Sequence, residues 1–102
     1  MSAKLESKGA GHFAVSGVLE AATVTGLLKR SRQMFAGHPE LHLDLDGVTE
    51  SDSAGLALLI EWLRQALRRR QKIVFQNMPR QIQALAQISE VEDLFTGQPK
   101  AA

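Results

Sequence analysis

Alternation of apolar and polar residues predicts three short β-strands. In the clearest of them, Leu-His-Leu-Asp-Leu-Asp, three leucines share one face while His42, Asp44 and Asp46 share the other. The first ten residues are small and polar, and they predict either a flexible tail or an edge strand. One face of the sheet is therefore expected to be apolar and the other polar. The predicted strands are residues 12–19, 41–46 and 73–76.

The segments between and after these strands repeat their apolar residues at the period of an α-helix. Thr23 is the expected N-cap of the first helix. In the long second helix, the expected core stripe leaves Leu58 and Trp62 one turn apart on the outward face. That stripe consists of Leu56, Leu59, Ile60, Leu63 and Leu67. The predicted helices are residues 23–36, residues 52–70 and a third helix that begins at Pro79.

The order strand, helix, strand, helix, strand, helix predicts an α/β fold with a mainly parallel sheet. Right-handed crossovers that always step the same way place the helices on one face of that sheet. The other face is expected to be bare, or partly hidden by a tail or a partner. Residues 11–96 are expected to form one domain, with a tail or edge strand at residues 1–10 and a flexible tail at residues 97–102.

The composition excludes several kinds of chemistry but does not indicate a binding partner. The 102 residues suffice for one domain, and the net charge of +1 gives no field that favours nucleic acid. The absence of cysteine excludes disulfides and thiolate chemistry. No run of residues is long and apolar enough for a secretory signal or a membrane span, so a cytoplasmic protein is expected.

Neither a metal nor a cofactor is predicted. The histidines fall in two strands and a turn, without the spacing of a metal site. The basic run at the end of the long helix lacks interleaved aromatic residues, and a solvated helix end explains it without nucleic acid. A lipid or other small ligand on the bare sheet face is left open, although the polar residues there disfavour an apolar pocket. The histidines are His12, His38 and His42, and the basic run is Arg64, Arg68, Arg69, Arg70 and Lys72.

The most informative segment is residues 44–56, which leads from a strand into the N-terminus of the long helix. Unpaired backbone N–H groups and the helix dipole favour negative charge at such a position. Asp52 or Ser51 can cap the helix, Gly55 permits close approach, and Ser53 places its hydroxyl on the first turn. Spacing alone leaves two interpretations open: simple helix capping, or a site for a phosphate or an acidic side chain.

Residues 43–48 also suggest a catalytic interpretation. The run Leu-Asp-Leu-Asp-Gly-Val resembles the nucleophile motif of haloacid-dehalogenase phosphatases, in which the first Asp attacks phosphorus and the second protonates the leaving group, with Mg²⁺ holding the phosphate. The strand here alternates instead of being apolar on both faces, the chain is short for such a domain, and the expected downstream Lys and paired acids are absent. No enzymatic activity is therefore expected.

Residues 12–95 resemble a STAS domain, the fold shared by anti-sigma-factor antagonists and the cytoplasmic tails of anion transporters. The likeness rests mainly on residues 43–45, Leu-Asp-Leu, and residues 52–59, Asp-Ser-Ala-Gly-Leu-Ala-Leu-Leu. Residues 61–64, Glu-Trp-Leu-Arg, and residues 79–86 make the chain most similar to one subgroup. That subgroup is the small STAS subunit of the ABC transporter that maintains outer-membrane lipid asymmetry.

The resemblance implies a β/α sheet without catalytic activity of its own, and it puts the family's phosphorylatable residue at Ser53. In the antagonists, a partner kinase phosphorylates this residue, which stops binding to the anti-sigma factor. In the transporter subunits, the equivalent residue, often Thr, lies at the contact with the ATPase subunit. Antagonists commonly carry a second Ser where this chain has Ala54.

The expected function is therefore that of a non-catalytic subunit that binds and regulates or stabilises the ATPase of a phospholipid ABC transporter. Such a subunit is cytoplasmic and peripheral to the inner membrane through its partner. The alternative is an anti-sigma-factor antagonist regulated by phosphorylation of Ser53. In both cases the outer face of the long helix is expected to dock, with Leu58 and Trp62 as anchors. The expected docking residues are Asp52, Ser53, Ala54, Gly55, Leu58 and Trp62.

Overall fold

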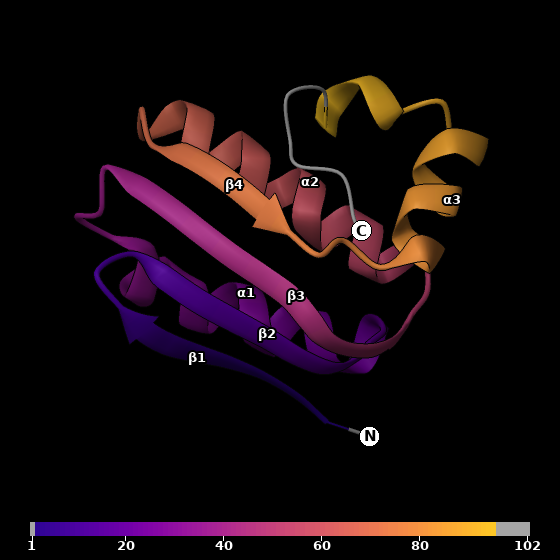
Figure 1. The fold of residues 1–102 in the computed structure, drawn as a ribbon, viewed down its shortest axis with the longest axis horizontal. Coiled ribbons are helices and arrows are strands. Elements are labelled where there is room, and N and C mark those ends of the chain that lie inside the picture. The colour runs from indigo at the N-terminus through magenta and orange to yellow at the C-terminus, as the bar shows by residue number, and fades with distance from the viewer. Residues whose placement is uncertain (1, 96–102) are drawn as a thin grey trace.

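The computed structural model describes residues 2–95, in which two consecutive strands are followed by alternating helices and strands, giving four strands and three α-helices (Figure 1). A short 3₁₀ helix, η1, follows the last α-helix. The elements are β1 (Ala3–Gly9), β2 (His12–Leu19), α1 (Ala21–Phe35), β3 (Glu40–Ser51), α2 (Ser53–Arg68), β4 (Lys72–Gln76), α3 (Arg80–Ile88) and η1 (Glu92–Phe95).

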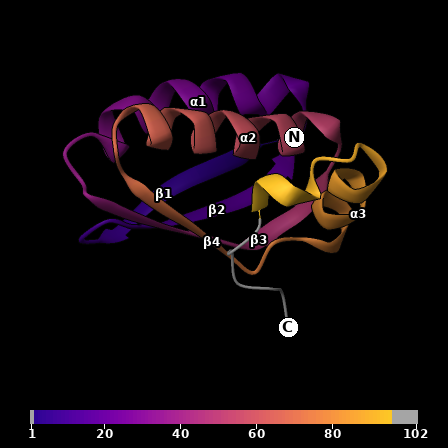
Figure 2. The ribbon, with the colours of Figure 1, turned by 90° about the horizontal axis from the view of Figure 1, so that it is seen from above.

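The strands form one sheet in the order β1-β2-β3-β4, in which β1 is antiparallel to β2 while β2, β3 and β4 are parallel. Helices α1 and α2 lie together on one side of this sheet (Figure 2). Helix α3 lies at one end of the sheet, where it packs against α2 and β3. The predicted α/β class with a mainly parallel sheet is confirmed. The first ten residues include strand β1, which forms one edge of the sheet. The predicted tail at residues 97–102 lies outside the described residues.

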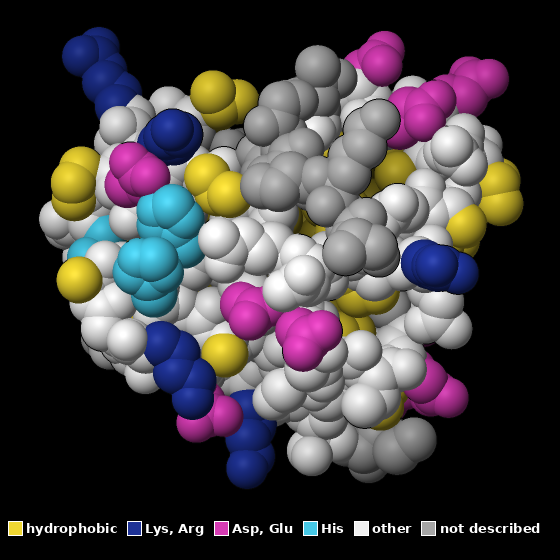
Figure 3. All heavy atoms as spheres, in the orientation of Figure 1, with side chains coloured by type: hydrophobic (Ala, Val, Ile, Leu, Met, Phe, Trp, Pro, Cys, Tyr) yellow, Lys and Arg dark blue, Asp and Glu magenta, His cyan; other side chains and the backbone are white. Residues whose placement is uncertain are grey.

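The two faces of the sheet differ as the alternation in β3 predicts. Leu41, Leu43 and Leu45 are buried under the helices, and the residues between them point to the opposite face. Histidine side chains gather on that face (Figure 3), where the rings of His12 and His42 stack with centroids 4.5 Å apart. The face away from α1 and α2 is therefore polar.

Two predicted boundaries are wrong because pairing and capping extend the elements. The expected loop at residues 47–51 is strand, since β3 stays paired with β2 as far as Ser51, opposite Leu19. Helix α1 starts at Ala21, before the expected cap at Thr23. The N-cap is Glu20, whose backbone N–H donates to Thr23 Oγ1 at 3.0 Å. Thr23 is thus the third helical residue, and its hydroxyl accepts the N-cap backbone N–H as in a capping box.

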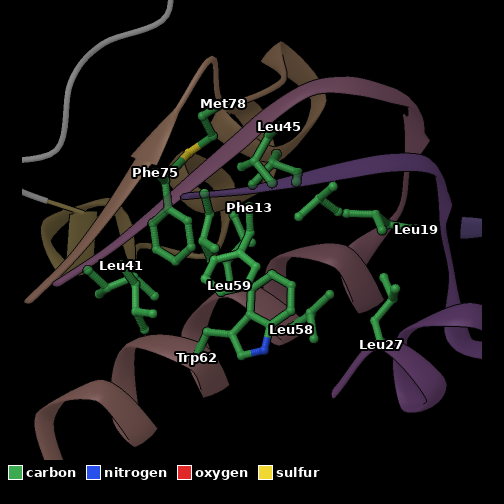
Figure 4. Packing of buried hydrophobic residues seen from close by; sticks show 14 of the residues in the cluster. Phe13, Leu19, Leu27, Leu41, Leu45, Leu58, Leu59, Trp62, Phe75 and Met78 are labelled. Carbon is green, nitrogen blue, oxygen red and sulfur yellow. The ribbon is translucent and has the colours of Figure 1, made fainter. Parts of the chain in front are cut away.

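The predicted outward face of α2 is wrong. Leu58 and Trp62 are 3% and 1% exposed, whereas Leu67, assigned to the core stripe, is 78% exposed. Figure 4 shows Leu58, Leu59 and Trp62 pointing from α2 into the buried cluster. The reason is that α2 packs on α1 as well as on the sheet, so its buried face is turned by roughly a quarter turn from the predicted stripe. The buried residues of α2 are Gly55, Leu56, Leu58, Leu59, Trp62 and Ala66.

Candidate functional site

The N-terminus of α2 is fixed at the point where β3 ends. The backbone N–H of Asp52 donates to the Leu19 carbonyl at 3.1 Å, which continues the pairing with β2 by one more bond. The Asp52 carboxylate then accepts the Ala54 backbone N–H at 2.8 Å, so Asp52 is the N-cap of the helix. Of the two capping candidates in the sequence, the structure selects Asp52.

Gly55 lets the first turn of α2 approach β2 and β3 closely. A Cβ atom at this position would lie 3.0 Å from Leu19 Cβ and 3.2 Å from Ser51 Cβ, which is tighter than ordinary van der Waals contact. Gly55 is itself buried, so it contributes no surface to a partner. Its role is to hold Asp52 and Ser53 at a fixed place above the end of the sheet.

Ser53 is the exposed residue of this turn. Its hydroxyl has no hydrogen-bond partner within residues 2–95, and it stands on the first turn of a 16-residue helix. A phosphate here would gain about 0.3–1 kcal/mol from the helix dipole, opposed by the neighbouring carboxylate of Asp52. The Ser53 hydroxyl is therefore exposed to solvent at a helix end that favours negative charge.

A contact that the sequence does not reveal joins this turn to α3. The Gln81 side-chain oxygen accepts the Ser51 backbone N–H at 2.9 Å. Because Ser51 and Gln81 are 30 residues apart, no local pattern signals the contact. It ties the start of α3 to the residue that precedes the cap, which further fixes the position of Ser53.

A shallow groove of about 420 Å³ runs between α1 and α2 beside this turn. Its walls are small or apolar, and Glu61 stands at its far end. We call it the α1–α2 groove. It is lined by Ala21, Val24, Thr25, Leu28, Ala54, Ala57, Leu58 and Glu61. The sequence does not reveal this groove, because its signal is only a set of small residues on two helices whose pairing the sequence does not show.

The six expected docking residues fall into three groups. Asp52, Ser53 and Ala54 lie together at the exposed or half-buried start of α2. Leu58 lies at the floor of the α1–α2 groove with little exposed surface. Gly55 and Trp62 are internal.

Trp62 holds the two helices together from inside. Its indole Nε1–H donates to Ser31 Oγ at 2.9 Å, and its ring lies 5.5 Å from the ring of Phe35 on α1. Ser31 in turn donates to the Leu28 carbonyl at 2.7 Å. Trp62 therefore shapes the α1–α2 groove without facing it, and it is not available as an anchor for a partner.

The two aspartates that prompted a catalytic interpretation lie in the middle of β3. Asp44 Oδ1 accepts the Asp46 backbone N–H at 3.0 Å and the Asn77 side-chain N–H at 2.9 Å. The strand continues to Ser51, so neither carboxylate stands at the end of a strand, where the phosphatase motif needs it. Within residues 2–95, no group of three or more His, Cys, Asp or Glu side chains is arranged to hold a metal ion.

A comparison with family models identifies the chain. The family model described as "Mlab, STAS domain" matches residues 3–96, and the chain belongs to the STAS domain family. Domains of this family are generally regulatory and without catalysis. No curated protein sequence matches the chain.

A solved structure supports the same fold. The chain is similar to the anti-sigma factor antagonist SpoIIAA in its unphosphorylated form, with a TM-score of 0.64 and 17% sequence identity. The alignment covers 93% of this chain and 98% of SpoIIAA. At this level of identity the likeness shows the STAS fold alone. Among the described helices, none combines the length and hydropathy that crossing a membrane requires.

Proposed function

We propose that this protein is a non-catalytic MlaB-type STAS subunit that binds and regulates or stabilises the ATPase of a phospholipid ABC transporter. The description of the matching family model favours this subgroup. The observation that carries the proposal is the pairing of an exposed Ser53 with the adjacent α1–α2 groove. Together they form a fixed surface with small and apolar walls and an exposed hydroxyl at its rim, which suits a protein partner better than a substrate.

The mode of docking follows from the shape of this surface. Small side chains such as Ala54 and Ala57 let a partner's backbone or a large side chain approach α2 closely. With Trp62 inside, the anchoring side chains must come from the partner and enter the groove. Ser53 at the rim is then desolvated by the complex, and a phosphate there opposes binding unless cations of the partner match it.

A second candidate is an anti-sigma-factor antagonist that is switched off by phosphorylation of Ser53. The structural likeness to SpoIIAA and the serine at this position favour it. Both candidates use the same surface, and they differ in the partner that it meets.

Purification from the native host in mild detergent, followed by identification of the associated proteins, tests the proposal. The wild-type chain should recover a membrane ABC complex through its ATPase subunit. Ala57→Arg fills the middle of the α1–α2 groove and should reduce recovery of the ATPase at least about tenfold, as removal of a hot spot does. Ser53→Glu should reduce it as well.

The matched control is Ala84→Arg, an equally drastic change at an exposed alanine on α3 outside the groove, and it should recover the ATPase like wild type. Full recovery by Ala57→Arg contradicts the proposed surface. Recovery of an ATP-dependent kinase that phosphorylates Ser53, in place of a transporter, contradicts the transporter role and supports the second candidate.

A further inference from the structure

A second apolar groove lies on the opposite flank of α2, between the C-terminal half of this helix and strand β4. It has a volume of about 310 Å³ and a floor made almost entirely of aliphatic side chains. Two of the residues at its edge, Leu67 and Leu94, are 78% and 51% exposed. We call it the α2–β4 groove. It is lined by Ile60, Leu63, Arg64, Ala66, Leu67, Gln71, Ile73 and Leu94.

Exposure of this kind is unusual within the molecule. Leu67, Leu94 and Ile88 are the large hydrophobic side chains exposed in residues 2–95, and two of these three belong to the α2–β4 groove. Large exposed apolar side chains that gather around a concave surface are typical of a binding site, whereas single scattered ones are not. The core of the domain does not account for them.

Positive charge lies on the α2 side of this groove. Residues 62–89 contain six of the chain's twelve Lys and Arg residues and no Asp or Glu. Arg64 and Arg68 both reach Glu61, at 3.5 and 3.8 Å, but they remain about two-thirds exposed. Such surface pairs contribute little energy, so these guanidinium groups can still pair with a partner. The α2 side of the groove is therefore cationic.

The closed end of the groove is held rigidly. The Gln71 side chain donates to the carbonyls of Phe35 and His38 at 2.7 and 2.8 Å, and its backbone N–H donates to the Ala66 carbonyl at 2.8 Å. These bonds fix the turn that joins α2 to β4. A preformed groove loses less conformational entropy when it is filled, which favours its use as a binding site.

We propose that the α2–β4 groove binds an acidic, amphipathic helical segment of a partner protein. The aliphatic floor of the groove would contact the apolar side chains on one face of the partner helix, as in other helix-in-groove complexes. The arginines along α2 pair with carboxylates on one flank of that segment.

The opposite rim distinguishes this occupant from an anionic membrane. Glu92 and Asp93 precede Leu94 on η1, so the groove is cationic on one side and acidic on the other. A flat anionic lipid surface would meet both rims at once and be repelled by η1, whereas a helix can present carboxylates to α2 alone. The concave floor also suits an inserted ridge better than a plane.

A second copy of the chain has fewer exposed apolar side chains to fill the groove than such a helix. Outside the groove, Ile88 is the large hydrophobic side chain that the described surface exposes. One side chain does not fill the floor. The proposal is independent of the proposed function, because the two grooves lie on opposite flanks of α2 and share no lining residue.

The test uses the isotope-labelled full chain and synthetic peptides of about 18 residues, a length that spans the molecule as a helix. The first peptide carries leucines on one helical face and glutamates on one flank. The second has lysines in place of the glutamates, and the third scatters the leucines around the helix. The first should bind about tenfold more tightly than either control, more weakly at higher salt, and should shift the NMR signals of Leu63, Leu67 and Ile73.

Leu67→Ser and Arg64→Glu change two residues that line the groove, and each should weaken binding of the acidic peptide about tenfold. The matched control is Ile88→Ser, a change at an equally exposed aliphatic residue on α3, and it should bind like wild type. Ala57→Arg should also leave this binding unchanged, which separates this result from the fate of the proposed function.

Three results overturn the proposal. The first is that the acidic peptide does not bind, or binds no better than the lysine peptide. The second is that phosphatidylglycerol vesicles bind the chain and the acidic peptide does not. The third is concentration-dependent self-association that Ile88→Ser abolishes, which assigns the groove to a second copy.

Discussion

At the scale of single residues, the contact between Trp62 and Ser31 decides how the helical layer is built. A serine on the inner side of α1 is 0% exposed because it accepts the indole N–H of Trp62, 31 residues further along the chain. Ser31 lies on the inward side of α1 together with Leu27 and Phe35. The local sequence gives no reason for a hydroxyl there, since its partner lies on another helix.

We expect a double-mutant cycle to show that these two side chains are coupled. Ser31→Ala leaves the buried indole N–H without a partner and should cost about 1–3 kcal/mol of the free energy of unfolding. Trp62→Phe removes the same hydrogen bond and should have a cost of its own from lost volume. In urea unfolding, the double variant should be more stable than the sum of the two single changes predicts. Strict additivity would show that the hydrogen bond contributes nothing.

At the scale of elements, α2 is buried along a wider and differently placed arc than an isolated amphipathic helix. It packs on α1, on α3 and on the sheet, so Leu58 and Trp62 face neighbours that are absent from a helical wheel. Leu67 points away from these neighbours, whereas Ala66, beside it in the last turn, is buried against them. The same placement leaves one groove on each flank of the helix.

Matched leucine substitutions test this orientation of α2. Leu58→Ala opens a cavity in the core and should lower the free energy of unfolding by about 2–5 kcal/mol. Leu67→Ala removes an exposed side chain and should change it by less than about 0.5 kcal/mol. Both values follow from urea titrations of the purified variants. Equal costs for the two changes would contradict the orientation described here.

At the scale of the whole molecule, the sheet is most firmly built at its centre. Strands β2 and β3 are each flanked by strands on both sides, whereas β1 pairs only with β2. Leu5 is the fully buried residue of β1. The α1–α2 and α2–β4 grooves both border α2, which packs on this sheet on the side away from its polar face (Figure 2).

Hydrogen exchange should follow this arrangement. The backbone amides of Leu43 and Leu45 in β3 should exchange only through global unfolding, while those of β1 should exchange sooner through local opening of the edge. Exchange measured by NMR at several low urea concentrations separates the two routes. Equal protection of β1 and β3 would show that the edge strand opens only with the core.

The sequence by itself determined the class of the fold. Alternation in residues 41–46 separates the two faces of the sheet, and the 3.6-residue period marks the helices. Capping chemistry places the start of α2 at Ser51 or Asp52, and the run that follows indicates the family. These features are local, because they depend on residues a few positions apart.

Only the tertiary structure decided which side of α2 is buried and where the grooves lie. Trp62 combines large apolar area with one N–H group, and it can serve equally well as an exposed anchor or as an internal one. Its hydrogen bond to Ser31 and its ring contact with Phe35 on α1 make Trp62 an internal anchor. A helical wheel gives the angles between side chains but not the directions of the neighbouring elements, and burial depends on those directions.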